Sequence, residues 1–238
     1  MKYVFCLFIG LTASALTAQS LSAETILNKS IAYHDPNGNW DSFRGELLIT
    51  MQTHNRPKRQ THLQWDFPRE YFKSSVTQGG VTTQSLWEKG RCTHWYENST
   101  SFSDAIAQKH RLNCATTTKM RNYYTYLYGL PMKLKDPGAQ LDPKVLRRTL
   151  NGEPFLCLRV TYTEEVGKDT WYFYLDPESY QLRHYQFYHN ESEGDGEYVL
   201  LSGEEIIQGI KMPKTRAWYT NADDRYLGTD VLNNPAIR

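Results

Sequence analysis

The sequence predicts a mainly β protein with two or three helices, built on a large curved antiparallel sheet that forms a half-open barrel. Residues 169–219 are expected to form four consecutive strands, because apolar and polar residues alternate and turn residues separate the runs. Residues 46–96 repeat this pattern five times, with a turn signal about every eight to twelve residues. Aromatic residues, which favour strands, make up 13% of the chain. A sheet of about ten or eleven strands tends to curl, and we expect helices to cover its concave face.

The first predicted element after residue 23 is a helix at Glu24–Asp35, where Ile26, Leu27 and Ile31 share one face. The stretch Pro36–Gly38 ends this helix. Five strands follow, each bounded by glycine, proline or asparagine turn signals. They are Glu46–Thr53, Gln60–Phe67, Glu70–Gln78, Thr82–Glu88 and Arg91–Tyr96.

The middle of the chain interrupts the strands. Asn98–Cys114 is predicted to be a polar loop with a short helix at Asp104–His110. A stronger helix is predicted at Thr116–Tyr128, with residues 116–118 as its cap and residues 129–131 as its stop signal. We expect this helix to lie across the concave face, because its apolar side needs an apolar surface. The long Lys133–Asp142 connection is expected to flank the entrance of a cavity.

The second half of the chain returns to strands. Val145–Leu150 and Phe155–Thr163 form a predicted hairpin through Asn151 and Gly152, a pair typical of two-residue turns. The four-stranded meander then closes the predicted sheet, with strands at Trp171–Leu175, Tyr180–His189, Glu197–Ile207 and Lys211–Tyr219. Tyr226–Arg238 is predicted to be a polar tail.

The N-terminal residues Met1–Ala23 are predicted to be a secretory signal peptide, with Lys2 before an apolar run and small residues near the cleavage point. We expect residues 24–238 to form one antiparallel half-barrel domain. This remainder is formally neutral, because the 27 basic residues include one in the signal and the 26 acidic residues include none. A neutral chain lacks the excess positive charge that binds nucleic acid or an anionic membrane, so neither partner is expected. The mature chain is expected to be an exported monomer without a transmembrane segment, periplasmic or associated with the outer membrane.

Three cysteines remain after the signal. Cys92 and Cys114 bracket a polar stretch, and we favour a disulfide between them because export leads to an oxidising compartment. Three cysteines also allow other pairings. Cys157, inside an apolar strand, is expected to be a buried free thiol. The sequence contains no Cys-x-x-Cys spacing, the pattern that would suggest a metal site. No metal or cofactor is therefore expected.

Four stretches of the sequence are distinctive. They are RNYYTYLYGLPMKLKDPG (Arg121–Gly138), DTWYFYLDPESYQLRHYQFYH (Asp169–His189), DGEYVLLSGEE (Asp195–Glu205) and GIKMPKTRAWYTNADDRYLGTDVL (Gly209–Leu232). They resemble a family of exported bacterial proteins of unknown function, over about residues 24–232. More distantly, the layout resembles the LolA- and LolB-like lipoprotein-carrier superfamily. That resemblance implies an unclosed barrel whose concave face, capped by helices, holds acyl chains, and it implies no catalytic residue.

The aromatic stripes of the predicted strands and helix form either a core or the lining of a ligand cavity. The candidate ligand-binding residues are Trp65, Phe67, Trp87, Tyr124, Tyr128, Trp171, Phe173 and Phe187. The sequence contains no nucleophile elbow, zincin motif or P-loop. We therefore expect a non-enzymatic binding protein that holds a hydrophobic or lipid-like ligand.

Two other hypotheses stay open. One is an exported hydrolase or lyase, which would require side chains such as His34, His94, His184 and Glu204 to converge in one cleft. The other is a cell-envelope interaction module without a ligand cavity, which would bind a protein partner through an exposed strand edge.

Overall fold

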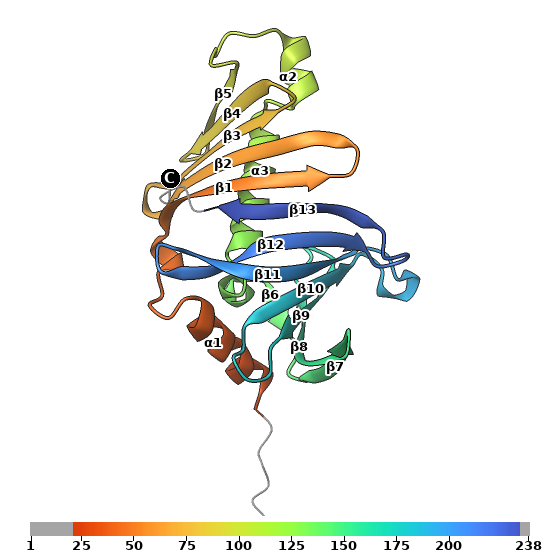
Figure 1. Ribbon diagram of the computed structural model, residues 1–238. Coiled ribbons are helices and arrows are strands. Elements are labelled where there is room, and N and C mark those ends of the chain that lie inside the picture. Colours follow the sequence, from red (N-terminus) through yellow and green to blue (C-terminus); the bar gives the residue numbers. More distant parts are fainter. Residues whose placement is uncertain (1–20, 234–238) are drawn as a thin grey trace, which may run out of the picture.

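Thirteen strands pair into one antiparallel sheet in the computed structural model, which describes residues 21–233 (Figure 1). The strands are β1 (Arg44–Thr53), β2 (Arg56–Asp66), β3 (Tyr71–Gln78), β4 (Val81–Glu88), β5 (Arg91–Tyr96), β6 (Ala139–Leu141), β7 (Leu146–Leu150), β8 (Glu153–Tyr162), β9 (Thr170–Leu175), β10 (Leu182–Tyr188), β11 (Glu197–Ile207), β12 (Ile210–Thr220) and β13 (Tyr226–Asn233). Their order is β5-β4-β3-β2-β1-β13-β12-β11-β10-β9-β8-β6, and β7 also pairs with β8. The described residues also form three α-helices, α1 (Ala23–His34), α2 (Asp104–His110) and α3 (Cys114–Tyr128). The predicted fold class, a large antiparallel sheet with a few helices, is confirmed.

The strand β13 corrects the prediction of a polar tail from Tyr226. It lies between β1 and β12 and joins the two meanders into one sheet. Its inward residues are Gly228, Asp230 and Leu232, of which only one is strongly apolar, so the sequence shows little strand pattern there. Gly228 is required because a Cβ would lie 2.8 Å from the Gln52 carbonyl oxygen of β1. The segment is a strand because β1 and β12 would otherwise each leave an unpaired edge.

Three smaller predictions also differ from the structure. Phe67 lies outside β2, in a 3₁₀ turn (η2, Phe67–Arg69). The Lys133–Asp142 connection contains a 3₁₀ turn (η3, Met132–Lys135) and the short strand β6, which pairs with β8. Asn113, rather than residues 116–118, caps α3, because its Oδ1 accepts a hydrogen bond from the Thr116 amide at 2.9 Å. With β6 and β13, the sheet has two strands more than the eleven predicted.

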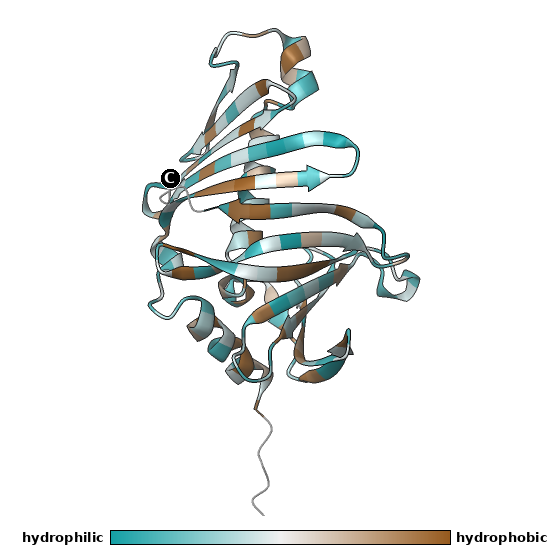
Figure 2. Ribbon diagram, in the orientation of Figure 1, coloured by the Kyte–Doolittle hydropathy of each residue, from teal (hydrophilic) through white to brown (hydrophobic). Residues whose placement is uncertain are grey.

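The helix α3 crosses one face of the sheet, here called the inner face, as predicted (Figure 1). Its residues Tyr124, Leu127 and Tyr128 are buried against inward side chains of the strands. Hydrophobic and hydrophilic residues are interspersed along the strands (Figure 2). In β1 and β2, the buried residues Leu47, Ile49, Leu63 and Trp65 alternate with more exposed neighbours, as expected for a sheet with one face on the core. The helix therefore lies where its apolar side finds an apolar surface.

The helix α1 is anchored through its last residue, His34, which is 1% exposed. The His34 Nδ1–H donates to the Lys211 carbonyl oxygen at 2.7 Å, and Nε2 accepts from the Leu182 amide at 3.0 Å. A carbonyl only accepts and an amide N–H only donates, so this pair of bonds requires the neutral imidazole. Burial is the main cause of the lowered pKa of His34.

Acidification is therefore expected to destabilise the fold through His34. The unfolded chain takes up a proton at the ordinary pKa of about 6.5, whereas the folded chain resists protonation to a lower pH. Stability from this group is complete above that pKa and falls as pH drops below it, by at most about 1.4 kcal/mol per pH unit. Urea unfolding at about pH 7 and about pH 5 should show a smaller loss for His34→Gln than for the wild type. His54→Gln, in the exposed β1–β2 turn, is the control, and equal losses in all three proteins would contradict this role of His34.

Candidate functional site

A cavity of about 1130 Å³ lies beside α3. Its walls come from β2, β4, α3 and β9, and the segment after α3 and the β8–β9 loop also border it. Four of the eight predicted ligand-binding residues line it, namely Trp65, Phe67, Trp87 and Trp171. These aromatic residues are far apart in the sequence, so only the folding of the sheet brings them to one cavity.

Two of the three tryptophan rings, Trp65 and Trp171, are held by their neighbours. Trp65 Nε1 donates to the Thr125 hydroxyl of α3 at 3.2 Å. The Trp171 ring stacks on Phe187, with 4.7 Å between the ring centroids, and meets the Tyr126 ring of α3 edge-on at 5.3 Å. These contacts fix the rings before any ligand arrives, which reduces the entropy lost on binding.

The cavity wall also carries hydroxyl groups. Tyr126 of α3 and Tyr162 at the end of β8 share a hydrogen bond of 2.5 Å between their hydroxyl oxygens. Burial raises the pKa of Tyr162 to about 12 and raises that of Tyr126 as well, so both hydroxyls stay protonated at neutral pH. Neither residue is among the eight predicted from the sequence, because no local pattern indicates that the end of β8 meets α3.

The border of the cavity includes the segment that follows α3. Lys133, Asp136 and Pro137 line it, which places part of the predicted Lys133–Asp142 connection beside it. Lys133 and Asp136 form an ion pair across one turn of this segment. Val166 of the β8–β9 loop also lines the cavity and is 57% exposed.

The other four predicted ligand-binding residues lie outside the cavity lining. Tyr124, Tyr128 and Phe173 are 7%, 2% and 0% exposed and belong to the core under α3. Phe187 is partly buried, and its ring stacks against the Trp171 ring. Ligand contact by these eight residues stays a prediction, and four of them, Trp65, Phe67, Trp87 and Trp171, line the cavity.

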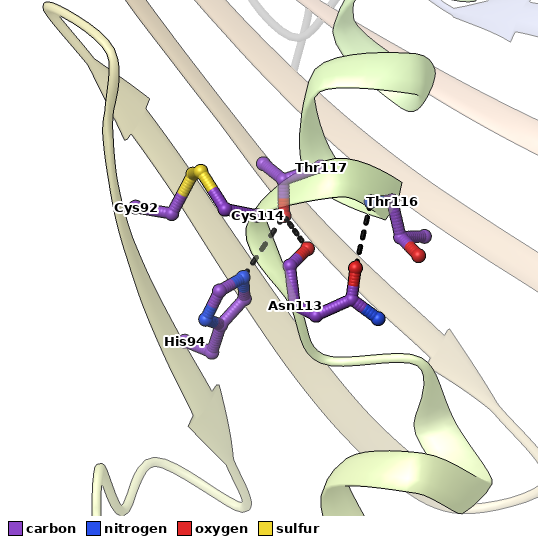
Figure 3. Close-up of a disulfide and its surroundings, with 6 residues drawn as sticks. All are labelled: Cys92, His94, Asn113, Cys114, Thr116 and Thr117. Atoms are coloured by element: carbon purple, nitrogen blue, oxygen red, sulfur yellow. Dashed lines mark hydrogen bonds between the residues drawn. A yellow bond between two sulfur atoms is a disulfide. The ribbon is translucent and has the colours of Figure 1, made fainter.

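A disulfide between Cys92 of β5 and Cys114 attaches the start of α3 to the sheet (Figure 3). This is the pairing that the sequence favours. Beside it, the His94 Nε2 lies 2.9 Å from the Thr117 hydroxyl, which makes a second link between β5 and α3 (Figure 3). Cys157 is a buried free thiol, and burial raises its pKa to about 12, so it is protonated and unreactive at neutral pH.

The four side chains of the enzyme hypothesis do not form one catalytic group. Both ring nitrogens of His34 bond the backbone, and His94 bonds Thr117. Glu204 accepts hydrogen bonds from Tyr33 at 3.0 Å and Gln181 at 3.1 Å. His184 points to the opposite, outer face, where it lines a separate hollow of about 510 Å³ and burial lowers its pKa to about 4. No geometry of the kind that acid–base catalysis needs joins them.

Two further searches cover residues 21–233. Within this range, no three His, Cys, Asp or Glu side chains gather as metal ligands would. Over the same residues, no helix is both long enough and apolar enough to cross a membrane.

No curated protein matches the chain. Among solved structures, it is similar to a LolA superfamily protein from Nitrosomonas europaea, with 11% identity, a TM-score of 0.49, and coverage of 90% of this chain and 93% of that one. It is also similar to a domain from Vibrio parahaemolyticus provisionally named as an outer membrane lipoprotein-sorting protein, with 12% identity, a TM-score of 0.48 and coverage of 90% of both chains. A DUF1329 family protein from Desulfovibrio piger follows, with 8% identity, a TM-score of 0.47, and coverage of 89% of this chain and 91% of that one.

At the level of sequence, one family model matches residues 2–234. The chain therefore belongs to DUF6503, a family of unknown function.

Proposed function

We propose that this protein is exported and binds a hydrophobic or lipid-like ligand in the cavity beside α3, without catalysing a reaction. The observation that carries the proposal is the convergence of Trp65, Trp87 and Trp171 on one cavity of about 1130 Å³. Ligand pockets are typically of this size or somewhat smaller, and are lined mainly by apolar and aromatic side chains with a few polar groups.

Two features support this function over its rivals. A filled sheet without a cavity would suit an interaction module, whereas this cavity is larger than the roughly 300 Å³ at which ligand pockets begin. The four side chains of the hydrolase or lyase hypothesis do not line this cavity, because His34, His94 and Glu204 bond partners elsewhere and His184 lies on a separate hollow. The predicted signal peptide at residues 1–23, most of which lies outside the described residues, supports export to the periplasm or the outer membrane.

The binding of an apolar probe should depend on free space beside α3. We expect the uncharged dye N-phenylnaphthylamine to fluoresce on binding the wild-type protein. Thr118→Trp, on the cavity wall, should fill part of the space and weaken dye binding by about tenfold or more, a change of about 1.4 kcal/mol. Thr116→Trp is the matched control, because Thr116 belongs to the same helix but does not line the cavity.

The control variant should bind the dye within about twofold of the wild type, since it leaves the cavity open. Native mass spectrometry of protein purified from its own cell envelope should show a bound small molecule. Dye binding that Thr118→Trp leaves unchanged, together with empty protein in every preparation, would contradict the proposal.

A further inference from the structure

One cation of the cavity wall is held in an unusual position. The Arg121 guanidinium lies over Trp87, with its central carbon 3.7 Å from the ring centroid. Its Nε and one terminal nitrogen donate to the Asn122 Oδ1, at 3.1 and 2.9 Å. The remaining N–H groups of the two terminal nitrogens form a free edge that can donate further hydrogen bonds.

No carboxylate of residues 21–233 forms an ion pair with Arg121. Glu70 also lines the cavity and its charge acts on Arg121, but only over a longer range. Partial burial is the main influence on this side chain and lowers its pKa, although the guanidinium stays charged at neutral pH. A partly desolvated cation without an ion pair gains from an anion that approaches its free edge.

The other charged groups of the wall are mostly neutralised or exposed. Lys133 pairs with Asp136, and Asp169 bonds the His189 Nδ1 at 2.8 Å. Glu165 is exposed to solvent. Lys119, exposed on the same wall, is a second cation without an ion pair. Glu70, another carboxylate of the lining, is also exposed to solvent. The cations without an ion pair, Arg121 and Lys119, both belong to α3, so positive charge lies on the α3 side of the cavity.

We propose that the cavity takes an anionic amphiphile, whose carboxylate or phosphate oxygens bond Arg121 and whose apolar chain lies along the tryptophan walls. This inference rests on the proposed function, because it assigns the ligand class of the same cavity. Arg matches the geometry of a carboxylate or phosphate with two parallel N–H bonds, and Trp87 holds the guanidinium in place beforehand. The aromatic wall that includes Trp65 and Trp171 supplies the apolar surface for the chain.

Competition between matched amphiphiles tests the ligand class. Dodecanoate, dodecyl phosphate, dodecanol and dodecylammonium share one chain and differ in the head group, and each would displace N-phenylnaphthylamine below its micelle concentration. We expect one or both anions to bind the wild type about tenfold more tightly than dodecanol. The comparison of the two anions shows whether a carboxylate or a phosphate head is preferred.

Arg121→Gln should remove this preference, leaving dodecanol binding within about twofold of the wild type. Arg121→Lys keeps the charge but loses the planar fork, and should keep only part of the preference. Arg91→Gln, at the exposed start of β5, should behave as the wild type.

The outcomes separate the two proposals. If the dye does not bind, and none of the four amphiphiles binds either, the proposed function fails together with this inference. If dodecanol binds as tightly as both anions, or dodecylammonium binds best, this inference alone is overturned. This inference is also overturned if Arg121→Gln keeps the full preference for an anion. The two variants Arg121→Gln and Arg91→Gln would then bind the amphiphiles alike.

Discussion

Replacing Arg216 by methionine is expected to lower the free energy of unfolding by about 3–5 kcal/mol, the cost of leaving a buried charge without its partner. Arg216 lies on the inner face of β12 and is 1% exposed. One terminal nitrogen donates to the Pro213 carbonyl oxygen at 2.9 Å, and the guanidinium carbon lies 3.9 Å from the centroid of Tyr128 on α3. In β13, Asp230 is its direct cross-strand neighbour and is 8% exposed.

The reason for the large effect is the carboxylate that remains. Burial raises the pKa of Asp230, and the positive charges of Arg216 and Arg59 oppose that rise. Methionine fills a similar volume but carries no charge, so Asp230 would lose the positive charge that acts on it most strongly. Arg59 is only partly buried and compensates less well, because solvent screens its charge.

A double-mutant cycle measures this coupling. In the wild type, Trp218 Nε1 donates a hydrogen bond to Asp230 Oδ2 at 3.1 Å. Asp230→Asn removes the carboxylate charge, and the amide oxygen of the new side chain can still accept this hydrogen bond. The double variant Arg216→Met, Asp230→Asn should therefore recover about 1–3 kcal/mol relative to the sum of the single variants in urea unfolding. Arg225→Met, in the exposed β12–β13 turn, should change stability by less than about 0.5 kcal/mol. Strictly additive losses would show that the two buried charges do not depend on each other.

Loss of the Cys92–Cys114 disulfide is expected to lower the free energy of unfolding by about 2–4 kcal/mol. The cysteines are 22 residues apart, and their bond restricts the unfolded chain across α2 and the start of α3. In the folded protein, it holds one end of α3 to β5, which is the last strand at one edge of the sheet. Without it, the hydrogen bond between His94 and Thr117 remains at this end.

Thermal unfolding with and without dithiothreitol checks this expectation. The double variant Cys92→Ala, Cys114→Ala should unfold at the lower temperature in both conditions, and reduction should bring the wild type to the same value. Cys157→Ala is the control, because its thiol is buried and free, and it should keep the full response to the reductant. Amide hydrogen exchange should quicken first in the N-terminal turns of α3. A variant without the disulfide that is as stable as the wild type would disprove the role of this link.

Most elements of the fold could be predicted from the sequence, because they depend on local physics. The alternation of Leu63 and Trp65 with polar neighbours indicates a half-buried strand wherever that strand lies. The same alternation predicts the inward residues of the meander. Trp171 and Phe173 face inward and pair with Phe187 and Tyr185 of the next strand. The end of α3 follows from the sequence Gly129–Pro131, which cannot continue a helix.

The site was only partly predictable, because whether an aromatic side chain lies in a core or on a cavity wall depends on what covers it. Trp171 and Phe173 are two residues apart and share a face, yet only Trp171 lines the cavity. Phe173 is covered by neighbouring core side chains, which the periodicity of its own strand does not report. Tyr126 belongs to the same helix as Tyr124 but points to the cavity, where it meets Tyr162 from another part of the chain.

The sequence by itself determined most of the segments that form strands and helices and which two cysteines were favoured to pair. Only the tertiary structure decided that Tyr226–Asn233 is a strand, because its pairing energy comes from the free edges of β1 and β12. The tertiary structure also decided that Arg216 is buried and that Arg121 lies on a cavity wall without an ion pair. Both positions depend on contacts between segments far apart in the chain, and a charged residue carries no local sign of such contacts.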